Sequence, residues 1–453
     1  MRISNLILPV LSILAAAGLT ALFFPGMMSY DSIYQYRQVI GAVPVTNDHP
    51  PVMVHLWRIA HAAIPSPGAL LLIHQIVYWA AAALFAWGMV SAPLWRIFIF
   101  LLVGCWPPLL IHSVHLWKDT GMMIAMMACV SLLIADSRKP RTVFLLLSVC
   151  FLLYAMAVRH NAFTGAIPLA AGIAWRISTR VQFSRPRNAF AAITAGAILI
   201  TGLGFGFSRS FDTKFDRPSV SRWIGAFDLS AVSLARSENL FPASIASMQR
   251  AGFMSDLRAA FRPETNNDLY KVIDIPKDQE SEVTSAWISL MKTHTADYLK
   301  HRAYVFRRLL GAHRGILFYP FHHGIDKNEL GLTFRSLDQT FPAWRNWFDR
   351  ASRSFVYRPW PYLILAIAGF ALSIFWLFRN TLNQNRAFIL ILTSSGLMSS
   401  LPLFVFTPAA DYRYVLWLVC SSLLATIVFV IDISTRRRIA NEAAARSREN
   451  APA

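Results

Sequence analysis

Residues 6–24 read LILPVLSILAAAGLTALFF, an uncharged apolar run close to the start of the chain. A helix needs about 20 predominantly apolar residues to cross the hydrocarbon core of a bilayer. The run is longer than the apolar core of a secretory signal peptide, and no convincing small-residue cleavage site precedes the polar stretch that follows it. The sequence therefore predicts a retained first membrane-spanning helix.

Apolar runs of similar size recur along the 453-residue chain, in which hydrophobic residues make up 55% of the sequence. Such a composition excludes an ordinary soluble domain. We expect an all-α polytopic membrane protein with about ten transmembrane helices. The run at 162–175 is short, which leaves a partly re-entrant segment open there. The predicted spans lie near 5–24, 67–90, 97–112, 120–135, 142–158, 162–175, 189–207, 360–378, 387–406 and 412–431.

The formal net charge of +19 follows the same pattern. Basic residues gather in alternate loops, as the positive-inside rule requires of cytoplasmic segments. The alternation predicts ten spans with both termini in the cytoplasm, in the cell (inner) membrane and in contact with its lipids. Because the charge follows the topology, it argues against nucleic acid as a partner. The residues in question are Arg96, Arg138, Lys139, Arg141, Arg176, Arg180, Arg185, Arg187, Arg379, Arg386, Arg436, Arg437 and Arg438.

The predicted spans divide the chain into four parts. Within the long polar stretch that they place outside, apolar residues at helical spacing from Ser281 to Leu310 predict an amphipathic helix near the outer headgroups. The parts are an N-terminal transmembrane module at 1–207 with its first outer loop at 25–66, an extracytoplasmic, mainly helical domain at 208–357, C-terminal transmembrane helices at 358–432, and a basic cytoplasmic tail at 433–453.

Ionisable residues collect at the outer ends of the predicted spans, whereas the middles of the spans are almost free of them. A charge at mid-bilayer costs at least ~2.5–3.5 kcal/mol on insertion scales. One layer of acids and bases on a single face predicts a site at the membrane–water boundary rather than an ion path. Its members are Asp31, Asp48, His49, His115, Lys118, Asp119, Arg159, His160, Asp411 and Arg413.

The first outer loop holds an acid in an aromatic-rich segment, Tyr30-Asp31-Ser32-Ile33-Tyr34-Gln35-Tyr36, and the element Asp48-His49-Pro50-Pro51. This loop resembles the first extracytoplasmic loop of the GT-C superfamily of glycosyltransferases. A further likeness lies in Asp411-Tyr412-Arg413-Tyr414, which is similar to the arginine-tyrosine motif that opens a late helix in several such families. The resemblance implies an enzyme with a GT-C-like fold, which transfers a sugar with inversion from a polyprenyl-phosphate donor to an extracytoplasmic lipid, glycan or protein acceptor.

The resemblance assigns the role of general base to Asp31. A carboxylate within hydrogen-bond reach of the acceptor hydroxyl typically contributes ~10²–10⁴-fold to the rate. The alternative role of Asp31 is to cap the helix that follows it. Cations at headgroup depth would stabilise the donor phosphate, although Lys and Arg also snorkel from helix ends to the interface without such a role. The candidate substrate-binding residues are Asp48, His49, His115, Lys118, Arg159, His160 and Arg413, of which Lys118, Arg159 and Arg413 are the candidate phosphate ligands.

No metal site is assigned with certainty. The paired acids that some members of the superfamily carry are absent, because Ser32 and Ile33 follow Asp31. Asp48 and His49 would supply an oxygen and a nitrogen ligand to a divalent metal ion if the loop brought them together. The cofactor requirement therefore stays open.

Two functions of other classes compete with the enzyme. A transporter or flippase of a lipid-linked glycan should place polar groups at mid-depth on broken helices, where only His74 and Gln75 stand out. A non-catalytic assembly partner would bind other envelope proteins through the domain at 208–357.

Overall fold

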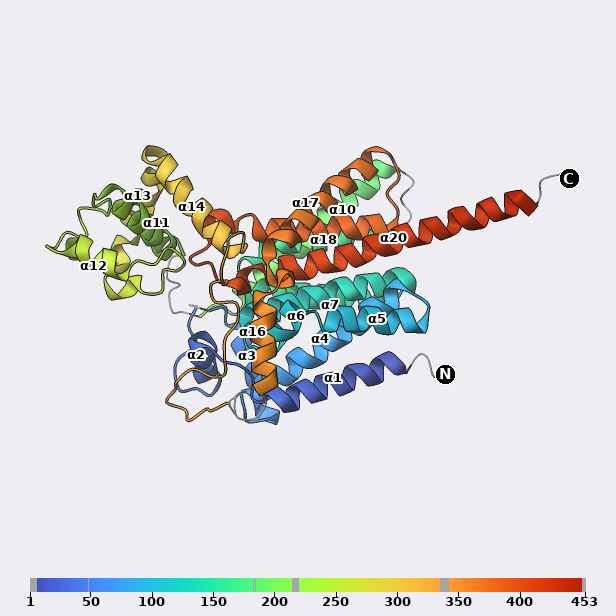
Figure 1. Cartoon of the computed structure of the whole chain (residues 1–453), viewed down its shortest axis with the longest axis horizontal. Helices are drawn as coiled ribbons and strands as arrows, with labels where there is room; N and C mark the ends of the chain where they lie inside the picture. Colours follow the sequence, from blue (N-terminus) through green and yellow to red (C-terminus); the bar gives the residue numbers. More distant parts are fainter. Residues whose placement is uncertain are drawn as a thin grey trace.

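The computed structural model describes residues 6–47, 49–181, 183, 185–213, 220–334 and 342–449, and for 220–221 and 444–449 only the backbone. This part of the chain is helical and forms no strand beyond isolated bridges. Its long helices run roughly alongside one another as a bundle (Figure 1). They are α1 (Ile7–Phe23), α4 (Gly68–Met89), α7 (Lys118–Arg138), α8 (Thr142–Val158), α9 (Ala162–Val181), α10 (Pro186–Arg209), α17 (Pro359–Phe378), α18 (Gln384–Ser400) and α20 (Leu416–Glu449).

Among the described residues, six helical segments are long and apolar enough to cross a membrane, namely α4, α7, α10, α17, Gln384–Phe406 and Tyr412–Ala443. The pair α5 (Pro93–Gly104) and α6 (Pro107–Ser113) would be a seventh, bent by 65°. The predicted spans at 5–24 and 142–158 became α1 and α8, which have only 17 residues each. The chain is therefore a multi-pass membrane protein, all-helical over the residues that the structure describes. At its centre α7, buried over almost its whole length, packs against α4 and α8.

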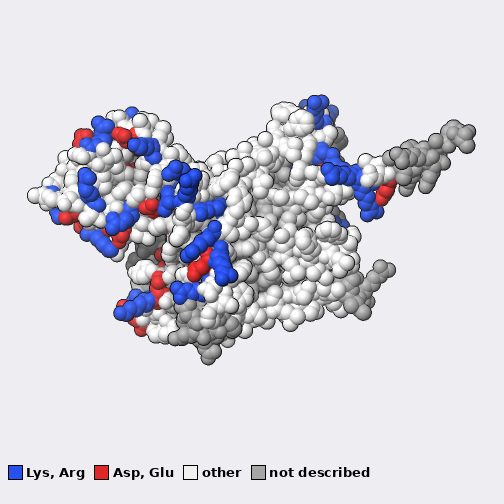
Figure 2. Space-filling view, in the orientation of Figure 1, with Lys and Arg blue, Asp and Glu red and all other residues white. Residues whose placement is uncertain are grey.

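The two ends of the bundle differ. Both termini lie at one end, which we call the terminal end, and a separate group of helices lies at the other, which we call the lobe end (Figure 1). Charged side chains gather at both ends, and a broad uncharged surface separates them (Figure 2). This uncharged surface is the part of the visible face that a bilayer would cover.

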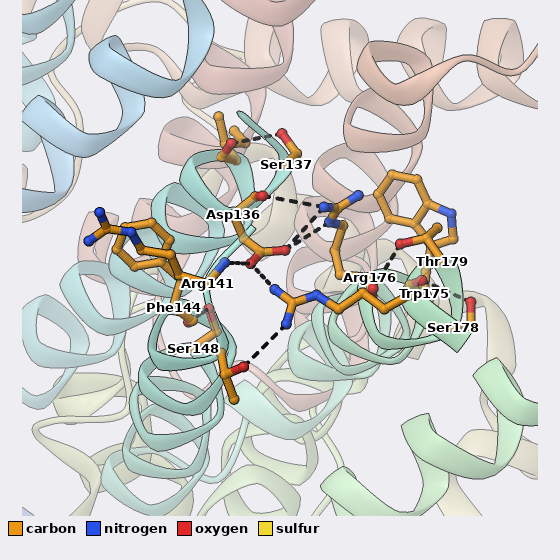
Figure 3. Close-up of polar contacts among 12 residues, drawn as sticks. Asp136, Ser137, Arg141, Phe144, Ser148, Trp175, Arg176, Ser178 and Thr179 are labelled. Atoms are coloured by element: carbon orange, nitrogen blue, oxygen red, sulfur yellow. Dashed lines mark hydrogen bonds and ion pairs between the residues drawn. The ribbon is translucent and has the colours of Figure 1, made fainter. Parts of the chain in front are cut away.

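Buried carboxylates bind the basic residues of the terminal end. Asp136 of α7 is fully buried and accepts hydrogen bonds from Nε and Nη2 of Arg176 on α9, at 3.2 and 3.1 Å (Figure 3). It also binds Arg180 and the backbone N–H of Arg141. Several arginines predicted for cytoplasmic loops thus also join helix ends.

The lobe consists of α11 (Val220–Arg236), α12 (Phe253–Ala260), α13 (Glu280–Thr293) and α14 (Thr295–Leu309) around a hydrophobic core of its own. The prediction of one amphipathic helix from Ser281 to Leu310 is wrong, because the chain breaks at His294 between α13 and α14. The basic residues of α14 do not all face lipid headgroups, as the prediction implied. Its Arg302 is fully buried, with Nη2 at 2.6 Å from Oδ2 of Asp228.

The remainder of the long polar stretch returns to the bundle. Leu317, Phe321 and Phe348 belong to the hydrophobic core of the bundle and not to that of the lobe. Phe348 lies on α16 (Pro342–Arg353), which contacts α6. The residues described between 208 and 357 therefore form a lobe followed by a segment that covers the lobe end of the bundle.

Candidate functional site

A short segment before α2 (Tyr30–Val39) fixes the first outer loop against the start of α7. Gly26 has a φ of +107°, and a Cβ there would lie 2.8 Å from Cγ of Leu116. The backbone N–H of Met27 donates to the Val114 carbonyl at 3.0 Å, and that of Leu116 donates to the Met27 carbonyl at 3.0 Å. A glycine is required here because its left-handed backbone lets the two segments approach closely.

Two side-chain hydrogen bonds continue this contact on either side of Asp31. The indole N–H of Trp117 donates to Oγ of Ser29 at 2.8 Å. The hydroxyl of Ser32 donates to the Leu116 carbonyl at 2.8 Å. Asp31 is thereby held in the first turn of α2, close to the start of α7.

The Asp31 carboxylate faces a cation and an imidazole. Nη1 of Arg413 lies 2.8 Å from its Oδ2, and Nε2 of His49 lies 4.0 Å from its Oδ1. On the other side of the imidazole, Nζ of Lys118 lies 2.7 Å from Nδ1 of His49. Residues far apart in the sequence thus form one chain of polar contacts.

A second chain of contacts runs from Arg413 to Arg159. Nη2 of Arg413 also lies 3.3 Å from Oδ2 of Asp411. Nη1 and Nε of Arg159 lie 2.9 Å from the two oxygens of Asp119, a two-point contact with a fully buried carboxylate. The ring of Tyr414 has both guanidiniums above it, at 4.9 Å for Arg159 and 5.5 Å for Arg413.

These residues form one set of three carboxylates, three cations and one imidazole. Within it, the Asp31 side chain is 32% exposed and that of Arg413 only 13%. Nε of Arg413 is buried and has no hydrogen-bond partner among the described residues, so it is a donor available to a ligand. We call the set the outer cluster; its members are Asp31, His49, Lys118, Asp119, Arg159, Asp411 and Arg413.

The surroundings set the charges of the outer cluster. Burial would raise the pKa of the Asp31 carboxyl, but Arg413, His49 and Lys118 together hold this pKa well below its usual range. Burial and the Lys118 cation lower the pKa of His49 to about 3. At neutral pH Asp31 is therefore an anion and His49 is neutral, with Nδ1 accepting from Lys118 and Nε2–H directed toward Asp31. Burial raises the pKa of Asp411, and Arg413 offsets only part of this effect.

The structure brings together His49, Lys118, Arg159 and Arg413 around Asp31, but not all predicted site residues. His115 is fully buried between backbone groups, with Nε2 at 2.9 Å from the His322 carbonyl and Nδ1 at 2.8 Å from the Ile111 carbonyl. It ties the outer loops together. His160 is exposed beside Arg159, and Asp48 lies outside the described residues.

Asp119 and Asp411 belong to the predicted polar layer but not to the predicted substrate-binding residues, and two aromatic residues of the site, Trp117 and Tyr319, were not predicted at all. Asp119 pairs with Arg159 and not with its neighbour in the sequence, Lys118. The Trp117 ring lies 5.3 Å from the Arg413 guanidinium, and the Tyr319 ring lies 6.1 Å from Trp117. Their position in the sequence could have identified three of these residues, because Asp119 and Trp117 are next to Lys118 and Asp411 is close to Arg413. Tyr319, which comes from a distant segment, had no such signal.

No metal-binding group of three or more His, Cys, Asp or Glu side chains occurs in the part of the chain that the structure describes. The proposed pairing of Asp48 with His49 lies outside this part. Nδ1 of His49 is already bonded to Lys118, and the Asp31 carboxylate to Arg413. The described side chains therefore do not form a ready ligand set for a divalent metal.

Chemically, the outer cluster combines one partly exposed carboxylate with cations that reach the same place from three segments. Such a site can hold an anionic group and accept a proton beside it. Comparison with protein-family models, curated sequences and solved structures finds no match to this chain. A function can therefore be inferred only from the chemistry of the outer cluster itself.

Proposed function

We propose that the chain is an inverting glycosyltransferase of the GT-C type, which transfers a sugar from a polyprenyl-phosphate donor to an extracytoplasmic lipid, glycan or protein acceptor. The observation that carries the proposal is the position of Asp31. Its side chain is the most exposed of the three carboxylates in the outer cluster, and its neighbours are Arg413, His49 and Lys118. A general base and a phosphate-binding site would thus lie next to each other.

In this mechanism the donor phosphate binds Arg413, with Lys118 and Arg159 nearby. The phosphate competes with Asp31 for the guanidinium, which also has a free donor at Nε. While Arg413 holds Asp31, the low pKa of the carboxyl makes it a weak base. Donor binding therefore strengthens the base at the moment when the substrate is in place.

The transfer step follows from this arrangement. Asp31 accepts the proton of the acceptor hydroxyl, whose oxygen attacks the anomeric carbon of the sugar. The bond between that carbon and the phosphate oxygen breaks, and polyprenyl phosphate leaves with the electron pair. The cations stabilise the negative charge that develops on the leaving phosphate.

The proposed topology has ten spans and both termini in the cytoplasm of a cell (inner) membrane protein. Six long helices, the bent pair α5–α6, the shorter α1 and α8, and α9 supply one helix or pair for each predicted span. The end of α7, where Asp136 binds Arg176 and Arg180, lies at the terminal end, and the start of α7, with Lys118 and Asp119 of the outer cluster, lies nearer the lobe (Figure 1). The positive-inside rule then places the outer cluster outside the cytoplasm.

The replacement Asp31→Asn tests the base assignment. Purified protein in lipid nanodiscs would be incubated with radiolabelled polyprenyl-phosphate sugars and candidate acceptors. We expect Asp31→Asn to lower transfer by ~10²–10⁴-fold while the protein stays folded at the assay temperature, which its thermal midpoint checks. Glu329→Gln is the matched control, because Glu329 is an exposed acid of the outer loops whose contact is Arg37, at 3.6 Å. An active Asp31→Asn enzyme would remove Asp31 from the role of base.

A transporter or flippase of a lipid-linked glycan is the second candidate, which the 65° bend between α5 and α6 favours. Two polar side chains near this bend are hydrogen-bonded within the protein, however, whereas both ring nitrogens of the buried His74 have no hydrogen-bond partner among the described residues. The Tyr78 hydroxyl donates to the Gly104 carbonyl at 2.9 Å, and the Gln75 amide donates to the Ser113 carbonyl at 2.9 Å. Labelled lipid-linked glycan that crosses vesicle membranes at the same rate with Asp31→Asn as with the unaltered protein, and without transfer, would favour transport.

A further inference from the structure

An open apolar groove of about 580 Å³ runs along the bundle between α1 and α4. Small residues form its floor, among them Ala16 of α1 and Ala80 of α4. Larger residues form its rims, and Ile13 and Ile76 are 67% and 52% exposed. The groove therefore has the shape and the apolar surface that an alkyl chain requires.

The length of the groove matches one leaflet of a bilayer. On α4 it extends from Ile76 to Trp87, which corresponds to roughly 16 Å at the rise of an α-helix. One half of the hydrocarbon core measures about 15 Å. A lipid from the leaflet at the terminal end would thus lie along its full length.

Three cations line the groove together with these apolar residues. They are Arg96 at the start of α5, and Lys139 and Arg141 between α7 and α8. Lys139 and Arg141 are exposed, and no Asp or Glu lines the groove. A cationic end on an apolar groove complements a lipid with an anionic headgroup.

The nearest carboxylate does not neutralise these cations. Asp136 binds Arg176 and Arg180 through their side chains, but it binds Arg141 only through the backbone N–H. The Arg141 side chain extends away from Asp136 and passes over the ring of Phe144, 5.9 Å from its centre (Figure 3). Its charge is thus directed toward the groove, which Phe144 also lines.

We propose that this groove binds one anionic glycerophospholipid of the leaflet at the terminal end. Its acyl chain lies between α1 and α4, and its phosphate binds Lys139 and Arg141 next to Arg96. The lipid would join α1 to the α7–α8 connection on the opposite side of the groove. This inference does not depend on the glycosyltransferase proposal, because none of its residues belongs to the outer cluster.

Native mass spectrometry of the purified full chain, titrated with dioleoylphosphatidylglycerol or dioleoylphosphatidylcholine, tests the proposal. We expect the first phosphatidylglycerol to bind at least tenfold more tightly than phosphatidylcholine. The double replacement Lys139→Gln and Arg141→Gln should weaken phosphatidylglycerol binding on the order of 30-fold, because it removes two charges near the headgroup, and should leave phosphatidylcholine binding unchanged. The backbone hydrogen bond from residue 141 to Asp136 is retained in this variant.

Two further variants distinguish lipid binding in the groove from non-specific electrostatic attraction to basic residues. Arg185→Gln with Arg187→Gln removes two exposed charges at the start of α10, outside the groove, and should not change the binding. Ala80→Trp fills the groove and should weaken the binding of both lipids. Equal binding of the two lipids, or an equal loss in the control pair, would overturn the proposal. A dimer of the unaltered protein that Ala80→Trp dissociates would instead assign the groove to a second copy of the chain.

Discussion

Arg413 contacts two carboxylates with different ends of one guanidinium, since Nη1 binds Asp31 and Nη2 binds Asp411. Only the planar fork of arginine can reach both acids in this way while Nε stays available. In the absence of substrate, Arg413 restrains the carboxylate that we assign as the base. With substrate, the same guanidinium would bind the phosphate, so one residue would couple donor binding to base strength.

Replacement of Arg413 tests this coupling. Arg413→Ala should raise the donor concentration for half-maximal rate about 10–100-fold, the equivalent of one lost hydrogen bond to a charged group. Arg413→Lys should restore little, because an ammonium cannot bind both acids and a phosphate at once. The measurement is the transfer rate as a function of donor concentration. Unchanged donor dependence in Arg413→Ala would exclude Arg413 from the phosphate site.

The acid sensitivity of the fold should depend on His49. Its native pKa of about 3 lies below that of an unfolded histidine, near 6.5, so between these values only the unfolded chain binds the proton. Stability therefore falls as the pH decreases through this window, by on the order of 2 kcal/mol between pH 7 and pH 5. In His49→Gln the difference between the thermal midpoints at pH 7 and pH 5 should be smaller. An equal difference in both proteins would show that His49 does not titrate in this way.

Most residues of the outer cluster could be predicted, but not their pairing. Asp31, His49, Lys118, Arg159 and Arg413 stood out because charges at the outer ends of apolar runs are costly to leave without a partner. Which acid meets which base depends on how the spans pack, since the pairs join segments up to 382 residues apart in sequence. The sequence carries no local signal for such long-range contacts.

Apolar length located the helices well and failed where they break. Each predicted span overlaps a helix of the bundle, because about 20 apolar residues are a strong local signal. The span predicted at 97–112 divides into α5 and α6, and Pro107 and Pro108, which cannot donate backbone hydrogen bonds, mark the break. The break at His294 has no adjacent Pro or Gly that would mark it in the sequence.

The lobe should lose its stability without Arg302. This residue is fully buried, pairs with Asp228, and donates from Nη1 to the Thr407 carbonyl at 2.7 Å. Arg302→Met would leave the Asp228 carboxylate buried without this cation, a change that costs about 3–5 kcal/mol in comparable pairs. Lys300→Met, on the exposed side of the same helix, is the control. We expect faster hydrogen exchange in α11–α14 of the first variant only.

The replacement Arg302→Met should also change the geometry of the outer cluster. Thr407 lies four residues before Asp411, and the lobe also binds this segment through the Glu264 carbonyl, which accepts from the Ala410 N–H at 2.8 Å. A loosened lobe would let Asp411 and Arg413 move. Arg302→Met should therefore lower transfer activity as well, whereas unchanged activity with fast exchange in the lobe would show that the outer cluster holds its geometry alone.

At the scale of the whole molecule, an uncharged surface separates two groups of charged residues with different roles. Near the terminal end, basic residues are bonded to buried acids such as Asp136 and Asp432, or line the groove between α1 and α4. Near the lobe end, the outer cluster assembles from the first outer loop, the start of α7, the end of α8, and the entry to α20. A site of this kind exists only when all these spans are packed, which explains why no single stretch of sequence encodes it.

Extracytoplasmic transfer requires that the protein be oriented in the membrane with the outer cluster outside the cytoplasm. This orientation can be measured directly. In a chain whose four native cysteines are replaced, a cysteine introduced at Lys300 of the lobe should react with a membrane-impermeant maleimide in intact cells. One introduced at Arg437 of the tail should react only after the membrane is permeabilised, because basic segments stay on the cytoplasmic side. The opposite labelling pattern would place the outer cluster in the cytoplasm, out of reach of an extracytoplasmic acceptor.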